Sequence, residues 1–186
     1  MKSQTEIWHY IDTRLADNLQ QFSTNNGFLG AQLYGESVKR DLHQARVAII
    51  GIDETRNADP MPYQSKADNV RYWLSQLAAF DNIGIIDMGN LISGNTIADT
   101  YKAVEFVTEY LSQLGVIPIY IGGSHDLSLP TVNGLLNSQK RVEFAIVDSS
   151  FDVAADCSAI TSRTFVKTIL ESAPKNIMGN IIGYQK

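Results

Sequence analysis

One histidine and two aspartates follow two apolar segments of the sequence in a pattern that could bind a metal ion. His125 comes directly after the segment that ends at Gly122 and Gly123, and Asp148 and Asp152 come after the next strand-like segment. If these segments are neighbouring strands of a parallel sheet, their carboxyl ends meet at one edge and the three side chains can converge there. A mixed set of imidazole and carboxylate ligands suits Mn²⁺, Fe²⁺ or Zn²⁺. Because a bound divalent ion lowers the pKa of its water, the pattern is compatible with metal-dependent hydrolysis.

The same residues also have a purely structural explanation. Two consecutive glycines allow a sharp turn, and a histidine in such a turn can bond to the backbone or cap the following helix. Asp126 and Ser128 are residue types favoured in the first turn of a helix. Asp148 is likewise a residue type that commonly begins a loop. Spacing alone leaves both explanations open.

Continuous apolar runs alternate with amphipathic segments along the chain, and this order would position the candidate ligands. The runs suit buried strands, and the segments between them repeat apolar residues every three or four positions, as helices do. Such alternation predicts an α/β fold of three layers, α/β/α, with a mainly parallel sheet. The expected strands are 46–53, 82–90, 116–123, 141–148 and 180–186, and the expected helices are 5–22, 67–80, 96–114, 127–139 and 158–172.

Local signals refine these elements. Asp68 is an expected N-cap of the helix 67–80, whose Trp73 is expected in the core. Gly115 stands where the helix 96–114 should end. The Gly- and Asn-rich segment 25–37 is expected to be a loop.

The chain is expected to contain one incomplete α/β domain. Residues 1–45 are interpreted as an N-terminal extension of helix and loop, and residues 46–186 as the N-terminal part of the α/β domain. A doubly wound sheet usually continues past a strand such as 180–186. We therefore expect further sheet beyond Lys186.

Composition limits the class of protein. The 186 residues include 44% hydrophobic and 19% charged residues, with a formal net charge of −5, which is typical of a globular domain. This mild acidity and the lack of a Lys/Arg run argue against nucleic acid as a partner. No apolar stretch reaches the roughly 18–20 residues of a membrane span, and the chain does not begin with a signal-peptide pattern, so a cytoplasmic location is expected. The single cysteine, Cys157, is expected to be an unpaired thiol and excludes an internal disulfide or a cysteine-based zinc cluster.

Two motifs resemble signatures of the ureohydrolase superfamily, which contains arginase, agmatinase and formimidoylglutamase. The segment 122–128, GGSHDLS, resembles the Gly-Gly-Asp-His-Ser signature, and 148–152, DSSFD, resembles Asp-Ala-His-x-Asp. The segments 48–60 and 85–107 are similar to the parts of the family that precede these signatures. The versions of the motifs resemble a divergent arginase-like group from Bacteroidetes-type bacteria. The resemblance runs from about residue 46 to the end of the chain and implies the arginase-like fold.

The resemblance also implies roles for individual residues in a centre of two Mn²⁺ ions. His125 and Asp152 match ligands of the first ion, and Asp148 matches the aspartate that bridges both ions. Ser150 stands where the family has a ligand histidine of the second ion, and a neutral hydroxyl is a weak ligand. Ser124 replaces the aspartate that precedes the first histidine. The two aspartates of a third signature, Ser-x-Asp-x-Asp, are expected beyond the end of the chain.

The activity implied by the resemblance is hydrolysis of a C–N bond in a linear amidine, guanidine or formimino compound. Because the second ion has lost its histidine, we expect at most one Mn²⁺, bound weakly, and no activity of this fragment. The alternative is a non-catalytic arginase-fold scaffold or a regulatory or ligand-binding protein. A nucleotide-binding domain has little support, since no G-x-G-x-x-G or G-x-x-x-x-G-K-[ST] motif occurs. Because family members are often trimers or hexamers, the full-length protein is expected to be a homo-oligomer.

Overall fold

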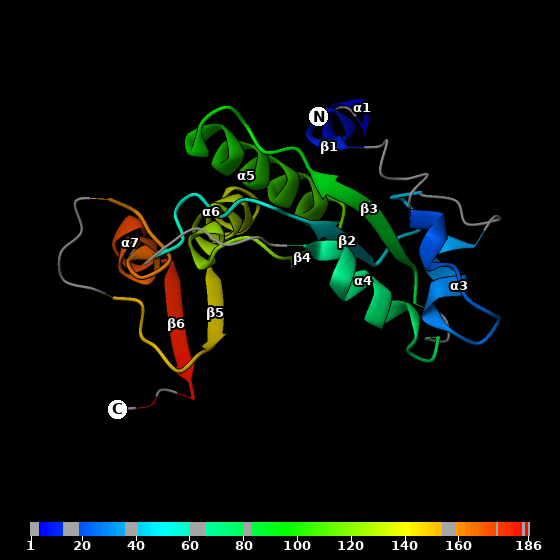
Figure 1. Cartoon of the computed structure of the whole chain (residues 1–186). Helices are drawn as coiled ribbons and strands as arrows, with labels where there is room; N and C mark the ends of the chain where they lie inside the picture. Colours follow the sequence, from blue (N-terminus) through cyan, green and yellow to red (C-terminus); the bar gives the residue numbers. More distant parts are fainter. Residues whose placement is uncertain are drawn as a thin grey trace.

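The strands of the protein form two blocks that lie side by side. The computed structural model describes residues 4–12, 19–35, 41–59, 66–79, 83–153, 159–173, 175–183 and 185. The first block has the order β1-β3-β2-β4, with β1 antiparallel to β3 and the other pairs parallel. The second block is the parallel pair β5-β6 (Figure 1). The strands are β1 (Ile11–Asp12), β2 (Val47–Gly51), β3 (Ile85–Leu91), β4 (Ile117–Ile121), β5 (Val142–Val147) and β6 (Ile177–Ile182).

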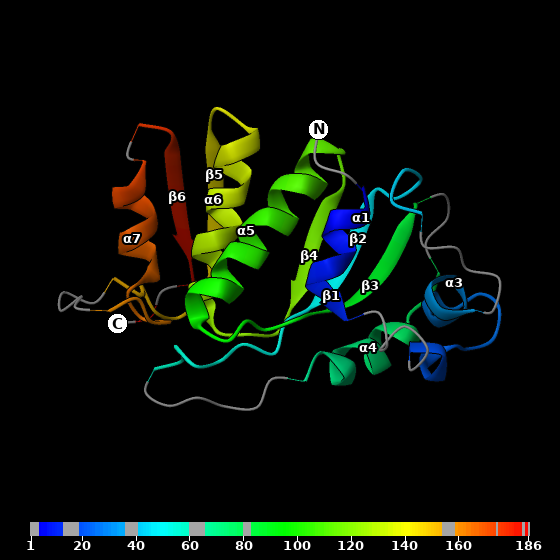
Figure 2. The same cartoon turned by 90° about the horizontal axis from the view of Figure 1, so that it is seen from above.

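Helices cover the sheet and complete the layers, as the two perpendicular views show (Figures 1 and 2). Residues of α5 pack on one face of the first block, while residues of α3 and α4 pack on the other. Residues of α6 and α7 pack on β5 and β6. The helices are α1 (Gln4–Ile7), α3 (Leu29–Tyr34), α4 (Ala67–Ser75), α5 (Ile97–Gln113), α6 (Ser128–Ser138) and α7 (Phe165–Ser172), with 3-10 turns η1 (Trp8–Tyr10), η2 (Gln20–Phe22) and η3 (His125–Leu127).

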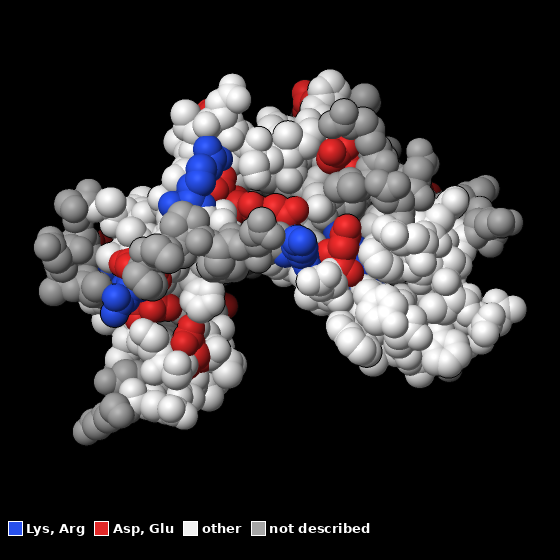
Figure 3. Space-filling model, viewed as in Figure 1, with Lys and Arg blue, Asp and Glu red and all other residues white. Residues whose placement is uncertain are grey.

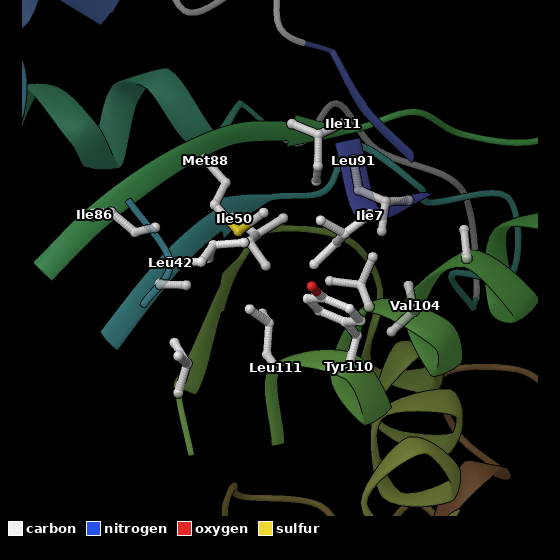
Figure 4. Packing of buried hydrophobic residues seen from close by; sticks show 14 of the residues in the cluster. Ile7, Ile11, Leu42, Ile50, Ile86, Met88, Leu91, Val104, Tyr110 and Leu111 are labelled. Carbon is white, nitrogen blue, oxygen red and sulfur yellow. The ribbon is translucent and has the colours of Figure 1, made fainter. Parts of the chain in front are cut away.

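The largest core cluster lies between the first block and α5. Consecutive residues of β2 serve opposite faces, because side chains alternate along a strand: Ile50 belongs to the α5 side, and Ile49 to the α3 and α4 side. Figure 4 shows Ile50 and Met88 from the sheet facing Leu111 from α5. The mainly parallel three-layer α/β fold predicted from the sequence is thus confirmed.

The helix α5 follows its sequence signals closely. Its N-cap Thr96 and Asp99 form a capping box, in which the side chain of each residue accepts a hydrogen bond from the backbone N–H of the other. Gly115 follows its end with φ of +74°, a left-handed conformation that glycine adopts without steric cost. Together these ends fix the helix that carries Thr100 and Tyr101 toward the candidate site.

The prediction of one helix over 5–22 was wrong. Residues 11–12 form β1, in which Ile11 pairs with Leu91 and Asp12 with Asn90 at the edge of the sheet. This pairing adds β1 to the edge of the sheet and places Ile11 in the largest core cluster. Conversely, the predicted loop 25–37 contains α3, because Leu29 and Leu33 are buried in the core.

The expectation that Trp73 lies in the core was also wrong, since Trp73 is 69% exposed. The inward face of α4 instead carries Ala67, Arg71 and Ser75. Asp68 is not the N-cap; the helix begins one residue earlier, and the Asp68 carboxylate pairs with Arg71 at 3.0 Å. The inward face of α4 therefore combines a buried polar network with Ala67 and the partly buried Leu74, which pack against the core.

The N-terminal residues pack closely with the rest of the chain. Ile7 and Ile11 are buried in the same cluster as Ile50 and Val104. The division into 1–45 and 46–186 stays a prediction. The expected helix over 158–172 begins at Phe165, and the ends of the expected elements at Phe80, at residue 82 and at residue 158 lie outside the described residues.

The described surface is mixed in charge. Figure 3 shows basic side chains standing singly or in small groups beside acidic ones on this face, and a wide uncharged area over α3 and α4. Tyr72, Trp73 and Leu77 are exposed there. Among the described residues, no helix has the length and apolar character needed to span a bilayer.

Candidate metal centre

His125 is presented by a tight turn at the carboxyl end of β4. Gly122 and Gly123 have φ of +89° and +76°, which turn the chain out of the strand and into η3. The space is also restricted, because a Cβ on Gly123 would lie 2.2 Å from Leu127 Cδ1. The turn is anchored to the loop after β2 by a hydrogen bond of 2.9 Å from the Ser124 N–H to the Glu54 carbonyl oxygen.

The two aspartates come from the loop that follows β5. The strand ends at Val147, and Asp148 then accepts a hydrogen bond of 3.0 Å from the Ser150 N–H. Asp152 has φ of +46°, a left-handed conformation that aspartate tolerates better than most residues. The strand conformation therefore ends before Asp148. The carboxylates of Asp148 and Asp152 nevertheless lie at the same edge of the sheet.

The structure brings the three predicted ligands together. His125 Nδ1 lies 3.3 Å from Asp148 Oδ2 and 3.4 Å from Asp152 Oδ2, and one donor atom from each residue lies within 4.8 Å of the others. The His125 side chain is 57% exposed, whereas those of Asp148 and Asp152 are 18% and 7% exposed. The cluster is thus open on the histidine side and closed on the carboxylate side.

A buried hydrogen-bonded cluster lies directly beside His125. Asp126 is fully buried and accepts hydrogen bonds from the hydroxyls of Ser124 and Tyr101. Burial, followed by the hydrogen bond to Asp126, raises the pKa of Tyr101, so its hydroxyl stays protonated at neutral pH. Tyr101 also accepts a hydrogen bond of 3.0 Å from the Asn57 side chain.

A second cluster ties the loop after β2 to α5. Glu54 is buried and accepts hydrogen bonds from Arg56 and from Thr100 Oγ1, the latter at 3.0 Å. Burial alone would raise the pKa of Glu54, but the hydrogen bonds from Arg56 and Thr100 outweigh it, and the pKa is lowered. Arg56 also donates to the carbonyl oxygens of Gly94 and Asn95. Arg56 and Asn57 thus both make hydrogen bonds within the chain.

Sequence reasoning missed the role of Asp126. It was considered only as a residue of the first helical turn, whereas its carboxylate bonds to Ser124 and Tyr101 instead of capping α6. The sequence did contain a sign of this role. Residues 124–126 are Ser-His-Asp, the reverse of the Asp-His-Ser in the family signature, so a carboxylate still stands next to the histidine. Ser150 is exposed, and Cys157 lies outside the described residues.

A cavity of about 370 Å³ opens beside the cluster, between β4 and β5. Its lining includes His125 and Phe165, whose rings meet edge to face with centroids 6.2 Å apart. No described strand pairs with the edges of β4 and β5 that border the cavity. A small molecule therefore has room to approach the imidazole from this side.

These features define a three-layer α/β protein with a candidate metal centre at the carboxyl ends of two strands. The chain belongs to the arginase family, whose model matches residues 51–182. A search of curated protein sequences found no match.

Solved structures of ureohydrolases have the same fold. A formiminoglutamase of Trypanosoma cruzi with Mn²⁺ superposes with a TM-score of 0.66 and 21% identity, over 78% of this chain and 55% of that one. A hypothetical agmatinase of Burkholderia thailandensis has a TM-score of 0.68 and 15% identity, over 89% and 56%. The formimidoylglutamase of Bacillus subtilis has a TM-score of 0.59 and 17% identity, over 70% and 44%. The chain thus spans about half the length of these proteins.

Proposed function

We propose that the chain is a ureohydrolase-type metallohydrolase domain whose site holds one Mn²⁺ ion through His125, Asp148 and Asp152. The substrate class is a linear amidine, guanidine or formimino compound, of which a C–N bond is hydrolysed. The observation that carries the proposal is the convergence of one donor atom from each residue within 4.8 Å.

The donor set fits such an ion. One imidazole nitrogen and two carboxylate oxygens suit Mn²⁺, and three protein ligands leave positions for water or substrate. When bound, the ion supplies Lewis-acid chemistry that makes water a nucleophile near neutral pH. His125 would hold the ion through Nδ1, the ring nitrogen that faces both aspartates.

The site is degenerate compared with a centre of two ions. Ser150 replaces a ligand histidine, and its exposed hydroxyl is a poor substitute. We therefore propose that binding is weak and that residues 1–186 alone do not hydrolyse amidines. For the full-length protein we propose a cytoplasmic homo-oligomer that acts on small molecules and binds neither nucleic acid nor membranes. The acidic side chains interspersed with basic ones on the face in Figure 3 argue against a nucleic-acid partner.

The second candidate function is a non-catalytic scaffold or ligand-binding protein with the arginase fold. The serine at position 150 favours it, because fold alone does not imply catalysis. In that case His125 and the two aspartates would remain close together without holding an ion.

Titration with Mn²⁺ distinguishes the two functions. Calorimetry, together with paramagnetic broadening of amide signals, should detect weak binding centred on the loops 122–128 and 148–152. Asp148→Asn should abolish it, while Asp59→Asn, at an exposed aspartate outside the cluster, should not. Absence of heat and of localised broadening in the parent chain would exclude the metal site and leave the scaffold.

A further inference from the structure

A hydrogen bond between its two neighbours in the chain encloses the backbone of His125. The Ser124 hydroxyl donates to Asp126 Oδ1, so a side-chain bridge joins the residue before the histidine to the residue after it. Ser124 is 4% exposed and Asp126 is fully buried, and solvent therefore does not compete for this bond. The bridge limits the backbone rotation that would redirect the imidazole.

The other carboxylate oxygen links this bridge to α5. The Tyr101 hydroxyl donates to Asp126 Oδ2 and accepts a hydrogen bond of 3.0 Å from Asn57 Nδ2. Tyr101 lies in a helix with a fixed N-cap, and Asn57 lies in the loop after β2. Both oxygens of the buried carboxylate are thus bonded to groups held by well-defined elements.

The same network reaches the ring that lies against His125. The backbone carbonyl oxygen of Asn57 accepts a hydrogen bond of 3.0 Å from the backbone N–H of Ser162, which lies in the segment that leads into α7. Phe165 of α7 then contacts the imidazole edge to face. His125 is therefore held from the backbone side by Asp126 and from the ring side by Phe165, although more than half of its side chain is exposed.

We propose that Tyr101, Ser124 and Asp126 form a positioning unit that aims His125 Nδ1 at Asp148 and Asp152. We assign none of these three residues as a metal ligand; they act on the site through His125. The benefit of this unit for metal binding rests on the proposed function, but the orientation of His125 exists without metal. Outer-shell partners of a metal-binding histidine typically change metal affinity by roughly 10- to 100-fold when removed, and we apply the lower end of that range to this unit because it acts on the imidazole through the backbone.

The test compares Tyr101→Phe with Tyr120→Phe. The first removes the hydroxyl that bonds to Asp126. The second removes a hydroxyl that pairs with Thr108 Oγ1 at 2.7 Å, away from Ser124 and Asp126. For each protein, the ¹⁵N and ¹H shifts of the His125 imidazole are recorded without metal, and Mn²⁺ affinity is then measured.

We expect Tyr101→Phe to shift the His125 imidazole signals and to lower Mn²⁺ affinity by roughly tenfold or more, while Tyr120→Phe changes neither. If the two variants match the parent in imidazole shifts and affinity, the positioning unit is excluded. If Tyr101→Phe does not fold, Ser124→Ala tests the same bridge with a smaller deletion and the same expected shifts.

The two proposals fail in different ways. A parent chain that binds no Mn²⁺ contradicts the proposed function, but the metal-free imidazole shifts still decide whether Tyr101 orients His125. A parent chain that binds Mn²⁺ at His125 equally well with and without the Tyr101 hydroxyl supports the function and overturns the positioning unit.

Discussion

The Arg71 guanidinium donates two hydrogen bonds to the Asp87 carboxylate, from Nε at 2.8 Å and from an Nη at 3.0 Å, with both side chains shielded from solvent. Between Ile49 and Ile50 the register of β2 against β3 shifts by one residue. The Gly89 N–H next to this bulge donates to Asp87, and the Gly89 carbonyl accepts from Arg71. The ion pair therefore holds the irregular end of β3 against α4.

Arg71→Met should destabilise the fold strongly. Removing one partner of a buried ion pair leaves an uncompensated charge and costs about 3–5 kcal/mol. Urea unfolding measures the loss. The matched control is Arg141→Met, whose exposed pair with Glu143 should contribute less than about 1 kcal/mol. Asp87→Asn should cost less in the Arg71→Met background than in the parent, and additive costs would contradict a coupled pair.

Stability should depend on the protonation of Glu54. Its pKa in the folded protein is lowered from the ordinary value of 4.5, so its contribution is present above that pH and is lost as the pH falls through the lower folded value. Glu54→Gln should therefore destabilise the protein near neutral pH, and the difference from the parent should shrink below about pH 4. Unfolding at a series of pH values checks this. A difference that is constant across pH would mean that the charge of Glu54 does not contribute.

The sequence predicts those parts of the fold that depend on local signals. Prediction from sequence fails where contacts with distant side chains determine which face of an element is buried. The strands 47–51 and 117–121 are continuous apolar runs, and α5 has its cap at Thr96. By contrast, the inward face of α4 depends on Arg71 meeting Asp87 across the sheet. A stripe of apolar residues gives no sign of such a partner, so periodicity pointed Trp73 inward.

The residues of the candidate site also differ in whether the sequence predicts them. His125, Asp148 and Asp152 could be predicted because they follow strand ends, and strand ends of a parallel sheet share an edge. Tyr101 could not, since it reaches Asp126 from near the start of an amphipathic helix, 25 positions away. Ligand candidates are visible in sequence, whereas the groups that orient them depend on tertiary packing.

Gly123 and Gly115 offer a matched pair of glycine substitutions. Both have positive φ, +76° and +74°, but a Cβ on Gly123 would meet Leu127 and the Glu54 carbonyl, whereas one on Gly115 would meet nothing within 4 Å. Gly115→Ala should cost about 1–2 kcal/mol, from the left-handed backbone alone. Gly123→Ala should cost about 1–3 kcal/mol more because of overpacking. Thermal and urea unfolding measure both variants, and equal costs would show that the turn before His125 has room to relax.

Ser150→His should strengthen metal binding. The Ser150 N–H donates to Asp148 at 3.0 Å, so residue 150 is held beside the carboxylates while its side chain remains exposed. An imidazole there adds a nitrogen ligand to a set of three, and we expect Mn²⁺ affinity to rise by roughly tenfold, equivalent to about 1.4 kcal/mol. Ser149→His is the matched control, because it adds the same group at the neighbouring exposed position, which the family does not use for a ligand. Titration of both variants, with and without His125→Ala, separates a shared site from a new one. Equal gains in the two variants, or a gain that survives His125→Ala unchanged, would mean that the added imidazole binds the ion independently and that position 150 does not belong to the His125 centre.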